Sequence, residues 1–356
     1  GSTAVVDGDN GPGAVVGTLA MDLALDLAQE HGSGWVAARN SNHYGAAFLY
    51  TRKALPLGMI GFSTTAAVPQ VAPYGGNAAA LGTNPLCIAV PGGKRGPIIL
   101  DMATTVVARG KVQLAALEGK PIPLGWAVDA QGRPTTDPVE ASKGRMLPLG
   151  GYKGYGLALM VEVFSSILTG AAFGRGIGEL FADFDRGQRM GHFFGALDVS
   201  AFMPVDEFRR RIDDLIAYLK GMPLAEGAEE ILVAGEPEAR KAAEYRLAGI
   251  PIAEDVVRYA VRITAASRPG PDNPLDFVNE WVTWGAGLRA SQYMVLGGKA
   301  RALLYGRAHV TFEDIRALAH PVLRHRVLIN YRAEAEGVTT DNLIDRLLKS
   351  VKESGK

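Results

Sequence analysis

The chain has 356 residues with 37 basic and 37 acidic side chains, so its formal net charge is zero. This length predicts about two domains, and the neutral balance gives no electrostatic reason to expect nucleic acid or an anionic membrane as a partner. Cys87 is the only cysteine, which excludes an intramolecular disulfide and fits a reducing compartment such as the cytoplasm. The most apolar stretch, 154–169, is interrupted by Glu162 and is shorter than the roughly 20 residues of a membrane span.

In the first 250 residues, short apolar runs alternate with turn-forming residues, and this pattern predicts an α/β (α+β) fold. Strands are predicted at 5–6, 35–38 and 98–100, and helices at 15–30, 154–169 and 205–220. The first helix ends at His31-Gly32, where glycine supplies a C-cap. The second is apolar on most faces and is expected to be buried. The third has one apolar stripe opposite a charged face, which is typical of an amphipathic helix.

The character of the sequence changes near residue 250, after which almost no strand signal remains. Helices are expected at about 254–267, 275–284, 289–305, 311–319 and 339–352. Thr311, and Thr339 or Thr340, are suitable N-caps. The prolines within 267–274 exclude a continuous helix there. We therefore predict two domains, 1–250 and 251–356, of which the second is separate and all-helical.

Two glycine-rich segments, 8–13 and 174–178, resemble parts of a dinucleotide-binding fingerprint. Neither places G-x-G-x-x-G between a strand and a helix, so we interpret both as turns. The sequence also contains no phosphate-binding P-loop, no histidine pair at zinc spacing and no C-x-x-C. No metal site is therefore predicted.

Polar residues at strand ends and helix starts are more informative, because small-molecule sites are often built there. They form the segments 40–45, 82–85, 100–105 and 150–156. The last one opens a helix beside Lys153, and free N–H groups next to a positive charge suit a phosphate. Taken singly, a strand-end aspartate is more often a turn former, a lone histidine is more often structural, and a lone lysine is more often solvated.

In this order, the segments resemble the malate/L-lactate dehydrogenase-like family. The matching motifs are S-N-H-Y-G at 41–45, G-T-N-P-L at 82–86, L-D-M-A-T at 100–104, G-G-Y-K-G-Y-G at 150–156, G-H-F-F at 191–194 and A-G-E-P-E at 234–238. The resemblance covers about residues 1–250. It implies a mixed, largely antiparallel sheet with flanking helices, which is not a Rossmann fold, and a homodimer or larger oligomer with the site near the subunit interface.

The resemblance implies an oxidoreductase that transfers a hydride between NAD or NADP and a small 2-hydroxy, 2-oxo or imino acid. Asp101 and His43 are the implied catalytic residues, with Asp101 orienting or polarising its partner. Thr83 and Asn84 are expected on the substrate side. Cofactor contacts are implied for His43, Tyr44, Gly45, Leu100, Asp101, Met102, Ala103, Lys153, Gly154, Gly235 and Glu236.

The sequence departs from the family pattern in two places. The family carries an N-terminal helical segment whose S-H-G histidine donates a proton to the substrate, and this sequence starts after that point. If that donor is essential, we expect weak cofactor binding and little or no turnover, since losing a positioned acid typically costs about 10²–10⁴-fold in rate. The family's P-G-E loop reads Ala234-Gly235-Glu236 here, and losing the proline should loosen that turn modestly.

The C-terminal segment resembles something else, the helical lid of MoxR-type AAA+ ATPases, at 255–262, 284–292 and 319–326. Arg289 is then implied as a sensor of the nucleotide's terminal phosphate, a role that suits a planar, permanently charged donor. The Walker elements of the preceding ATPase core are missing, so this lid cannot hydrolyse ATP alone. The join near 249–252 indicates either a gene fusion or an assembly artefact. The alternative function is an AAA+ lid or interaction module, with the first part as scaffold.

Overall fold

The computed structural model describes residues 1–179, 186–248, 252–305, 307 and 309–353. The chain divides into two compact units, Gly1–Ala239 and Arg240–Lys356. The domain boundary predicted between residues 250 and 251 lies outside the described residues.

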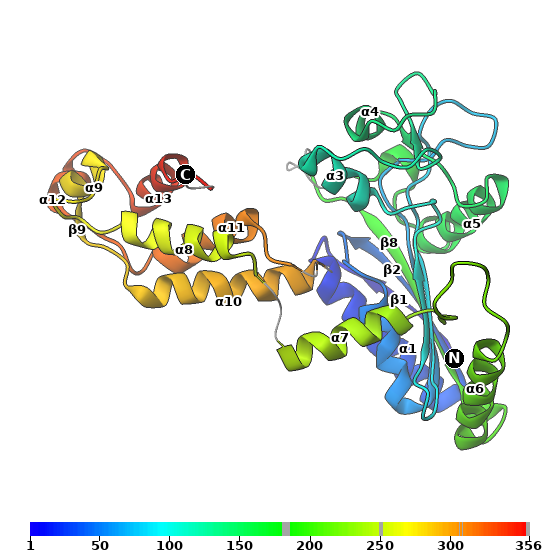
Figure 1. Ribbon diagram of the computed structural model, residues 1–356. Coiled ribbons are helices and arrows are strands. Elements are labelled where there is room, and N and C mark those ends of the chain that lie inside the picture. Colours follow the sequence, from blue (N-terminus) through cyan, green and yellow to red (C-terminus); the bar gives the residue numbers. More distant parts are fainter. Residues whose placement is uncertain (180–185, 249–251, 306, 308, 354–356) are drawn as a thin grey trace. The chain divides into compact units, whose positions relative to one another are not determined.

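The first unit is built on a six-stranded sheet (Figure 1). Its strands are β1 (Thr3–Asp7), β2 (Ser33–Ser41), β3 (Met59–Thr65), β4 (Leu86–Val90), β5 (Ile98–Met102) and β8 (Met190–Asp198), in the order β1-β2-β8-β3-β4-β5. β1 runs parallel to β2, and every other pair of neighbours is antiparallel. The predicted mixed, largely antiparallel sheet is confirmed. A short ribbon of β6 (Ala127–Val128) and β7 (Arg145–Met146) lies apart from this sheet.

Helix α1 (Gly13–His31) packs on the sheet through small residues. Ala20, Met21 and Ala24 on its inner face are fully buried. At Gly34 of β2, an added Cβ atom would lie 2.1 Å from the carbonyl oxygen of Ala24, so only glycine permits this close approach. The helix ends at Gly32 with φ +80°, which confirms the predicted glycine C-cap.

The other helical elements of this unit lie around the sheet and its loops. They are α2 (Phe48–Thr51), η1 (Arg52–Leu57), α3 (Arg109–Glu118), α4 (Pro138–Lys143), α5 (Tyr152–Glu162), η2 (Val163–Ile167), η3 (Gly174–Gly176), η4 (Val199–Ala201), α6 (Val205–Lys220) and α7 (Glu236–Ala248), which continues into the second unit. The predicted helix at 205–220 agrees with α6. The prediction of one buried helix at 154–169 is wrong, because α5 passes into the π-helical turn η2 and much of its apolar surface is exposed.

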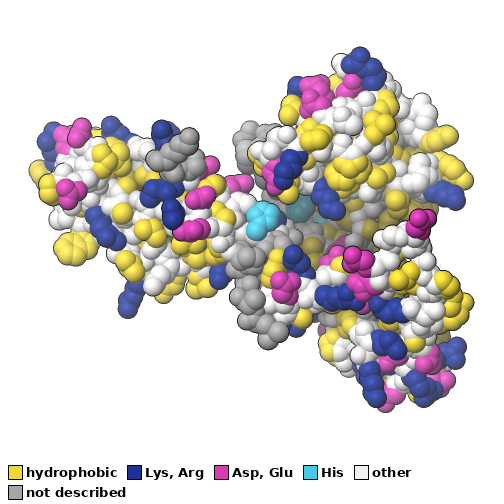
Figure 2. Space-filling model, viewed as in Figure 1, with side chains coloured by type: hydrophobic (Ala, Val, Ile, Leu, Met, Phe, Trp, Pro, Cys, Tyr) yellow, Lys and Arg dark blue, Asp and Glu magenta, His cyan; other side chains and the backbone are white. Residues whose placement is uncertain are grey.

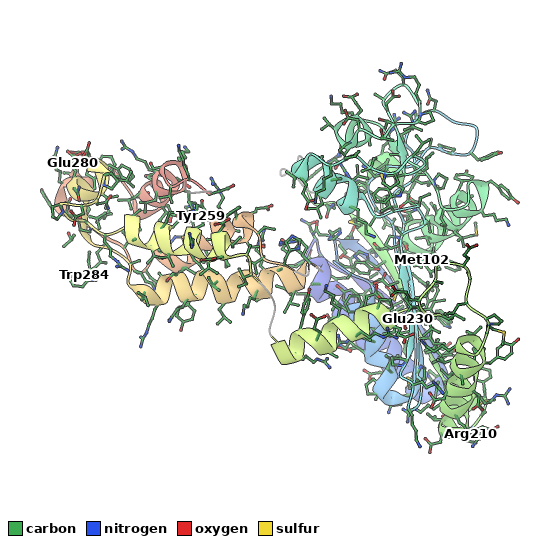
Figure 3. The ribbon with its side chains drawn as sticks, in the orientation of Figure 1. Met102, Arg210, Glu230, Tyr259, Glu280 and Trp284 are labelled. Carbon is green, nitrogen blue, oxygen red and sulfur yellow. The ribbon has the colours of Figure 1, made fainter. Side chains whose placement is uncertain are left out.

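The second unit consists of helices around their own apolar core. They are α8 (Glu254–Ala266), α9 (Asp276–Trp281), α10 (Leu288–Leu304), α11 (Phe312–Leu323), α12 (Tyr331–Ala335) and α13 (Thr340–Ser350). Tyr259 of α8, labelled in Figure 3, is fully buried. Its ring packs edge-on against Phe312 of α11. The all-helical prediction needs one correction: β9 (Val282–Trp284) pairs with β10 (Leu328–Ile329). The helix predicted at 275–284 therefore ends at Trp281.

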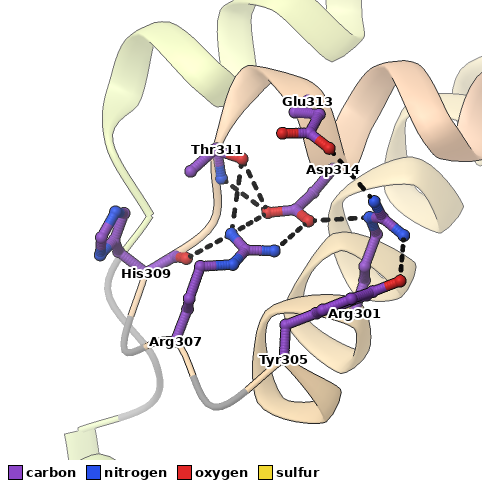
Figure 4. A network of polar contacts seen from close by, with 7 residues as sticks. All are labelled: Arg301, Tyr305, Arg307, His309, Thr311, Glu313 and Asp314. Atoms are coloured by element: carbon purple, nitrogen blue, oxygen red, sulfur yellow. Dashed lines mark hydrogen bonds and ion pairs between the residues drawn. The ribbon is translucent and has the colours of Figure 1, made fainter. Parts of the chain in front are cut away.

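A buried carboxylate holds α10 and α11 together (Figure 4). Asp314 has no exposed side-chain surface, and its carboxylate accepts hydrogen bonds from Arg307 (2.7 Å) and from the N–H of Thr311 (2.9 Å). Arg301 of α10 lies 3.0 Å from the same group. Burial opposes ionisation, but the bonds from Arg307 and Thr311 keep the pKa of Asp314 below its usual value. The predicted Thr311 cap is part of a capping box that stabilises the start of α11.

Among the helices of the described ranges, none combines the length and the apolar character that crossing a membrane requires.

A buried histidine connects the middle strands of the sheet. His192 of β8 is fully buried, with Nδ1 2.7 Å from Thr65 Oγ1 at the end of β3 and Nε2 2.9 Å from Ser41 Oγ at the end of β2. Its ring stacks on Tyr44 at 4.6 Å. Burial lowers the pKa of His192 to about 3. The folded protein therefore holds a neutral imidazole here at any ordinary pH.

This imidazole makes stability depend on pH. An unfolded histidine has a pKa of about 6.5, so between about pH 6.5 and pH 3 the unfolded chain binds one more proton than the folded chain at this position. The free energy of unfolding should therefore fall by about 1.4 kcal/mol for each pH unit of acidification in that window. The variant His192→Gln should lose this part of the slope, whatever its stability at pH 7.

Urea unfolding at about pH 7 and about pH 5 measures the slope, with hydrogen exchange of β8 reporting on the first unit. His31→Gln is the matched control, because His31 lies at the end of α1 and bonds none of these strands. A His192→Gln protein with the same slope as the control would assign the acid sensitivity to other groups.

Candidate functional site

Segments far apart in the sequence meet at β5, the edge strand of the large sheet. The N–H of Ile99 donates to the carbonyl of Ala234 (3.0 Å), which sets Gly235 beside the strand. Just beyond β5, the N–H of Thr104 donates to the carbonyl of Thr83 (2.9 Å). The N–H of Leu149, shortly before α5, donates to the carbonyl of Thr104 (2.9 Å). Backbone hydrogen bonds thus connect three distant parts of the chain, at Thr83, Leu149 and Ala234, to β5 or to the residues just after it.

Asp101 near the end of β5 links the fourth segment to this strand. Its Oδ2 accepts the N–H of Phe48 at the start of α2 (2.9 Å), shortly after residues 43–45. The residue keeps exposed surface, yet the atoms around its carboxylate desolvate it. This desolvation raises the pKa of Asp101; the Phe48 bond opposes the rise, and the charge of Glu238 adds to it. Asp101 is thus a carboxylate at the meeting point of β5, α2 and the first turn of α7.

The residues around Asp101 on β5 present different surfaces. Leu100 is exposed, whereas Met102 and Ala103 are half-buried. Opposite Asp101 in the register lies Cys87 of β4, which is fully buried. Burial and the charge of Asp101 raise the pKa of Cys87 to about 12. This thiol is therefore a packing group and not a nucleophile.

The loop 42–47 contains one packing residue and one accessible imidazole. Tyr44 is buried between the rings of Tyr50 and His192, and burial raises its pKa well above the usual value. His43 keeps an exposed edge, and its Nδ1 accepts the N–H of Gly45 (3.2 Å). An imidazole that accepts at Nδ1 carries its proton at Nε2. Burial of part of the ring lowers the pKa of His43, which favours the neutral form.

Asn84 lies inside the unit rather than at an open surface. Its side chain accepts the N–H of Ala67 (3.0 Å) and donates to the carbonyl of Ala158 (3.0 Å) and to Glu162 (2.7 Å). Both amide hydrogens are thus used in holding α5 to the sheet. Thr83 beside it is half-buried, and its carbonyl also accepts the hydroxyl of Thr104 (3.0 Å).

The start of α5 has the features of an anion-binding helix end. Gly150 and Gly151 have φ values of +59° and +66° and open space around them. At Gly154, an added Cβ would lie 2.2 Å from the carbonyl oxygen of Leu149, so a side chain there would push the first turn away. Gly151 provides no side-chain cap, and Lys153 is exposed on the first turn. Uncapped N–H groups and a lysine together favour a bound anion.

The turn before α7 borders β5 through its backbone, whereas the carboxylate of Glu236 is bound elsewhere. Gly235 has φ +85°, and a Cβ there would lie 3.0 Å from Ile99 of β5. The carboxylate of Glu236 pairs with Lys220 of α6 (2.8 Å) and accepts the N–H of Val233 (3.2 Å). Glu236 therefore braces the turn, and Gly235 is the residue that borders the strand.

Several residues that shape this region were not predicted from the sequence. Gln188 accepts the N–H of His43 (2.8 Å) and donates its own backbone N–H to Asn42 (3.0 Å), so it fixes the loop. Glu162 accepts from Asn84 and from the N–H of Gly174 (2.9 Å), and burial raises its pKa. The available signal was a lone charge inside an apolar helix, which indicates a buried polar partner. Gln188 carries no such signal.

Two hollows stand out on the described surface, and neither is lined by His43, Asp101 or Lys153. One, of about 290 Å³, lies between residues 72–77 and 145–151. The other, of about 300 Å³, is lined by Asp7, Asp9, Asn10, Asn40, Gly187 and Arg189. Neither of these two hollows is therefore the pocket that was expected around His43, Asp101 and Lys153.

The remaining predicted residue lies in the second unit. Arg289 is exposed on the first turn of α10, where Gly287 provides no side-chain cap. Leu288 and Trp284 beside it in the sequence are also exposed. The start of α10 therefore presents one cation among apolar side chains.

Comparison with known proteins places these observations in a family. Residues 1–260 match the family "Malate/L-lactate dehydrogenase", and residues 278–347 match the "AAA lid domain". L-sulfolactate dehydrogenase of Methanocaldococcus jannaschii is 46% identical over 239 residues, which are 67% of this chain and 68% of that protein. Malate dehydrogenase of Pyrococcus horikoshii is 42% identical over 243 residues, 66% of each chain.

The solved structure of the Methanocaldococcus jannaschii sulfolactate dehydrogenase superposes with a TM-score of 0.65 at 43% identity, over 72% of this chain and 73% of that one. Other relatives are named for their cofactor, as a ureidoglycolate dehydrogenase of Escherichia coli with NAD⁺ and a sulfolactate dehydrogenase of Chromohalobacter salexigens with NADP⁺. The sheet, the convergence on β5 and a family match over residues 1–260 agree, and the chain belongs to the malate/L-lactate dehydrogenase family.

Proposed function

We propose that the first unit transfers a hydride between NAD or NADP and a small 2-hydroxy, 2-oxo or imino acid in the cytoplasm. The observation that carries the proposal is that Phe48, Leu149 and Ala234, each close in sequence to a predicted segment, are hydrogen-bonded to β5 or to the residues just after it. The relatives named as malate and sulfolactate dehydrogenases support this class of substrate.

The start of α5 fits the phosphates of a dinucleotide. Its first-turn N–H groups have no side-chain cap, and Lys153 adds a positive charge next to them. Gly150, Gly151 and Gly235 leave room for a ligand to approach the backbone. When bound, the nicotinamide supplies or accepts the hydride. Leu100, Met102 and Ala103 would line its path along the end of β5.

Two side chains can manage the proton that accompanies the hydride. His43 is neutral and holds a proton at Nε2, which could be given to a developing alkoxide. Asp101 is fixed by the N–H of Phe48 and would orient or polarise the catalytic partner from the end of β5. Of the two residues expected on the substrate side, we propose Thr83, because Asn84 already donates both of its amide hydrogens to Ala158 and Glu162.

Replacing Asp101 tests its role directly. Asp101→Asn keeps an acceptor for the N–H of Phe48 but removes the charge, and kcat/KM should fall by about 10²-fold or more. Because the pKa of Asp101 is raised, wild-type activity should decline on acidification at a higher pH than an ordinary aspartate gives. The variant should lack that decline. Asp26→Asn on the exposed face of α1 is the control. Measurable turnover at the same rate in the two variants would exclude Asp101 from catalysis.

Replacing Lys153 tests the proposed phosphate site at the start of α5, and the test does not require turnover. Lys153→Gln should weaken the binding of NADH and NADPH about tenfold, which corresponds to about 1.4 kcal/mol. Titration followed by nicotinamide fluorescence or by melting temperature measures this. Lys94→Gln, in an exposed turn, is the matched control. If the wild-type protein binds neither NADH nor NADPH, the oxidoreductase proposal is wrong.

We also propose that a second copy of the chain covers the exposed apolar face of α5 and η2, which gives a homodimer. This face includes Leu157, Met160, Phe164, Ile167 and Leu168. Figure 2 shows hydrophobic side chains gathered on the upper right of the first unit, where Figure 1 labels α5. Apolar patches of this kind typically mark protein interfaces, and a twofold axis lets one patch cover its own copy.

Introducing a charge into this apolar face should break the dimer. Ile167→Glu would place a carboxylate on the patch, and sedimentation should then report the mass of one chain. Leu19→Glu on α1 is matched in exposure, at 58% against 56% for Ile167, and should leave the dimer intact. A wild-type protein that sediments as one chain at every concentration would contradict the proposal.

A second candidate function rests on the exposed Arg289 at the start of α10. In this alternative the chain is an accessory or interaction module of the AAA+ type with the first part as scaffold, and Arg289 contacts the terminal phosphate of a bound nucleotide. Adding ATP as a third ligand to the Lys153 titration separates the two proposals. A response to ATP without one to NADH or NADPH favours the module.

A further inference from the structure

The hollow between residues 72–77 and 145–151 contains an arginine whose charge is not neutralised. Of its lining residues, all of which belong to the described ranges, Arg145 alone is charged. Its guanidinium donates to Asn77 and, at 3.4 Å, to the carbonyl of Ala130. No carboxylate of the described residues forms an ion pair with it. A half-buried arginine with free donors is suited to bind an anion.

Asp129, which follows the strand partner of Arg145, already has partners of its own. Asp129 accepts the N–H groups of Gln131 and Arg133 (2.9 Å each), and its other oxygen pairs with the Arg133 guanidinium (2.9 Å). The same turn contains Gly132, where an added Cβ would lie 2.6 Å from Asn77 Oδ1 and 2.8 Å from Arg145 Nη2. Glycine at 132 therefore keeps open the space in front of the guanidinium.

The size and position of this hollow indicate what it could bind. Its volume of about 290 Å³ lies at the lower limit of ligand pockets, which are about 300–1,000 Å³. It suits one end of a ligand and not a whole dinucleotide. Gly151 lines the hollow and also precedes the first turn of α5, two residues from Lys153. The exposed ring of Tyr74 also lines the hollow and contacts Tyr152 edge-on.

We infer that this hollow binds an anionic group of a ligand held beside the start of α5, and that Arg145 is the binding residue. The inference rests on the proposed function for the ligand class. The anionic oxygens have two possible sources: the 2′-phosphate that distinguishes NADP from NAD, or the remote carboxylate or sulfonate of an acidic substrate. In both cases Arg145 determines specificity.

The first measurement uses inorganic phosphate and needs neither cofactor nor turnover. The ³¹P linewidth of phosphate is followed with the wild-type chain, Arg145→Gln, Arg145→Lys and Arg210→Gln. Arg210 is exposed on α6, outside the hollow (Figure 3), and serves as the control. Arg145→Gln should weaken phosphate binding about tenfold or more, since a bond to a charged group is lost. The phosphate affinity of Arg145→Lys should lie between those of the wild type and Arg145→Gln, because lysine keeps the charge but lacks the paired donors of the guanidinium.

The second measurement identifies the source of the anion. Dissociation constants are compared for NADPH against NADH, and for a dicarboxylic against a monocarboxylic 2-hydroxy acid. If Arg145→Gln loses about tenfold in affinity for NADPH but not for NADH, the anion is the 2′-phosphate. If it loses affinity for the dicarboxylic acid but not for the monocarboxylic acid, the anion belongs to the substrate. Either result supports the inference.

The inference is overturned if Arg145→Gln binds phosphate as Arg210→Gln does. It is also overturned if a protein that binds nicotinamide shows unchanged ratios in both ligand pairs. Should phosphate binding depend on Arg145 in a chain that binds neither NADH nor NADPH, the proposed oxidoreductase function fails while the anion site stands.

Discussion

An edge strand leaves one row of backbone groups without a neighbouring strand, and buried groups of this kind must find partners. β5 meets this requirement partly with a loop: the carbonyl of Ala234 accepts the N–H of Ile99. Just past its end, the chain continues the pattern through Thr104, which bonds both Thr83 and Leu149. The candidate site depends on these bonds, because they bring loops from distant parts of the sequence to the stretch of chain that contains Asp101. A further strand at this edge would take the place of the Ala234 loop.

Much of this arrangement could be predicted because local sequence signals agreed with the fold. The apolar stripe of α6 and the glycine after α1 mark their elements without help from tertiary contacts. The capping box at Thr311 does the same for α11. Residues 98–100 read as a strand because their apolar run ends at the polar Asp101, and β5 covers this run and continues to Met102. Where the local pattern alone decides the structure, a single sequence is sufficient.

Prediction from the sequence was wrong or incomplete where contacts between distant parts of the chain determine the structure. The stretch at 154–169 reads as buried because its residues are apolar, yet whether such a face is covered depends on a partner that the pattern does not name. The strands β9 and β10 have three and two residues, too few for an alternating pattern to be recognised. The interior position of Asn84 follows from its bonds to Ala67, Ala158 and Glu162, which are separated from it by long stretches of chain.

The two units have separate means of stabilisation. The first has a sheet whose middle strands share the buried His192, and the second has helices clamped by the buried Asp314 and its arginines. Each also has its own apolar core. A buried carboxylate is costly unless several donors surround it, so the Asp314 cluster favours one packing of α10 against α11 over looser ones.

The state of Cys87 has a practical consequence for studying this chain. A buried thiol with a pKa of about 12 is almost never a thiolate at neutral pH, and the thiolate is the species that reacts with alkylating reagents. Maleimide reagents should therefore leave Cys87 of the folded chain unlabelled. A cysteine introduced on the surface of each unit could carry a fluorophore pair without removal of the natural one, and energy transfer between the labels would then follow motion of one unit against the other.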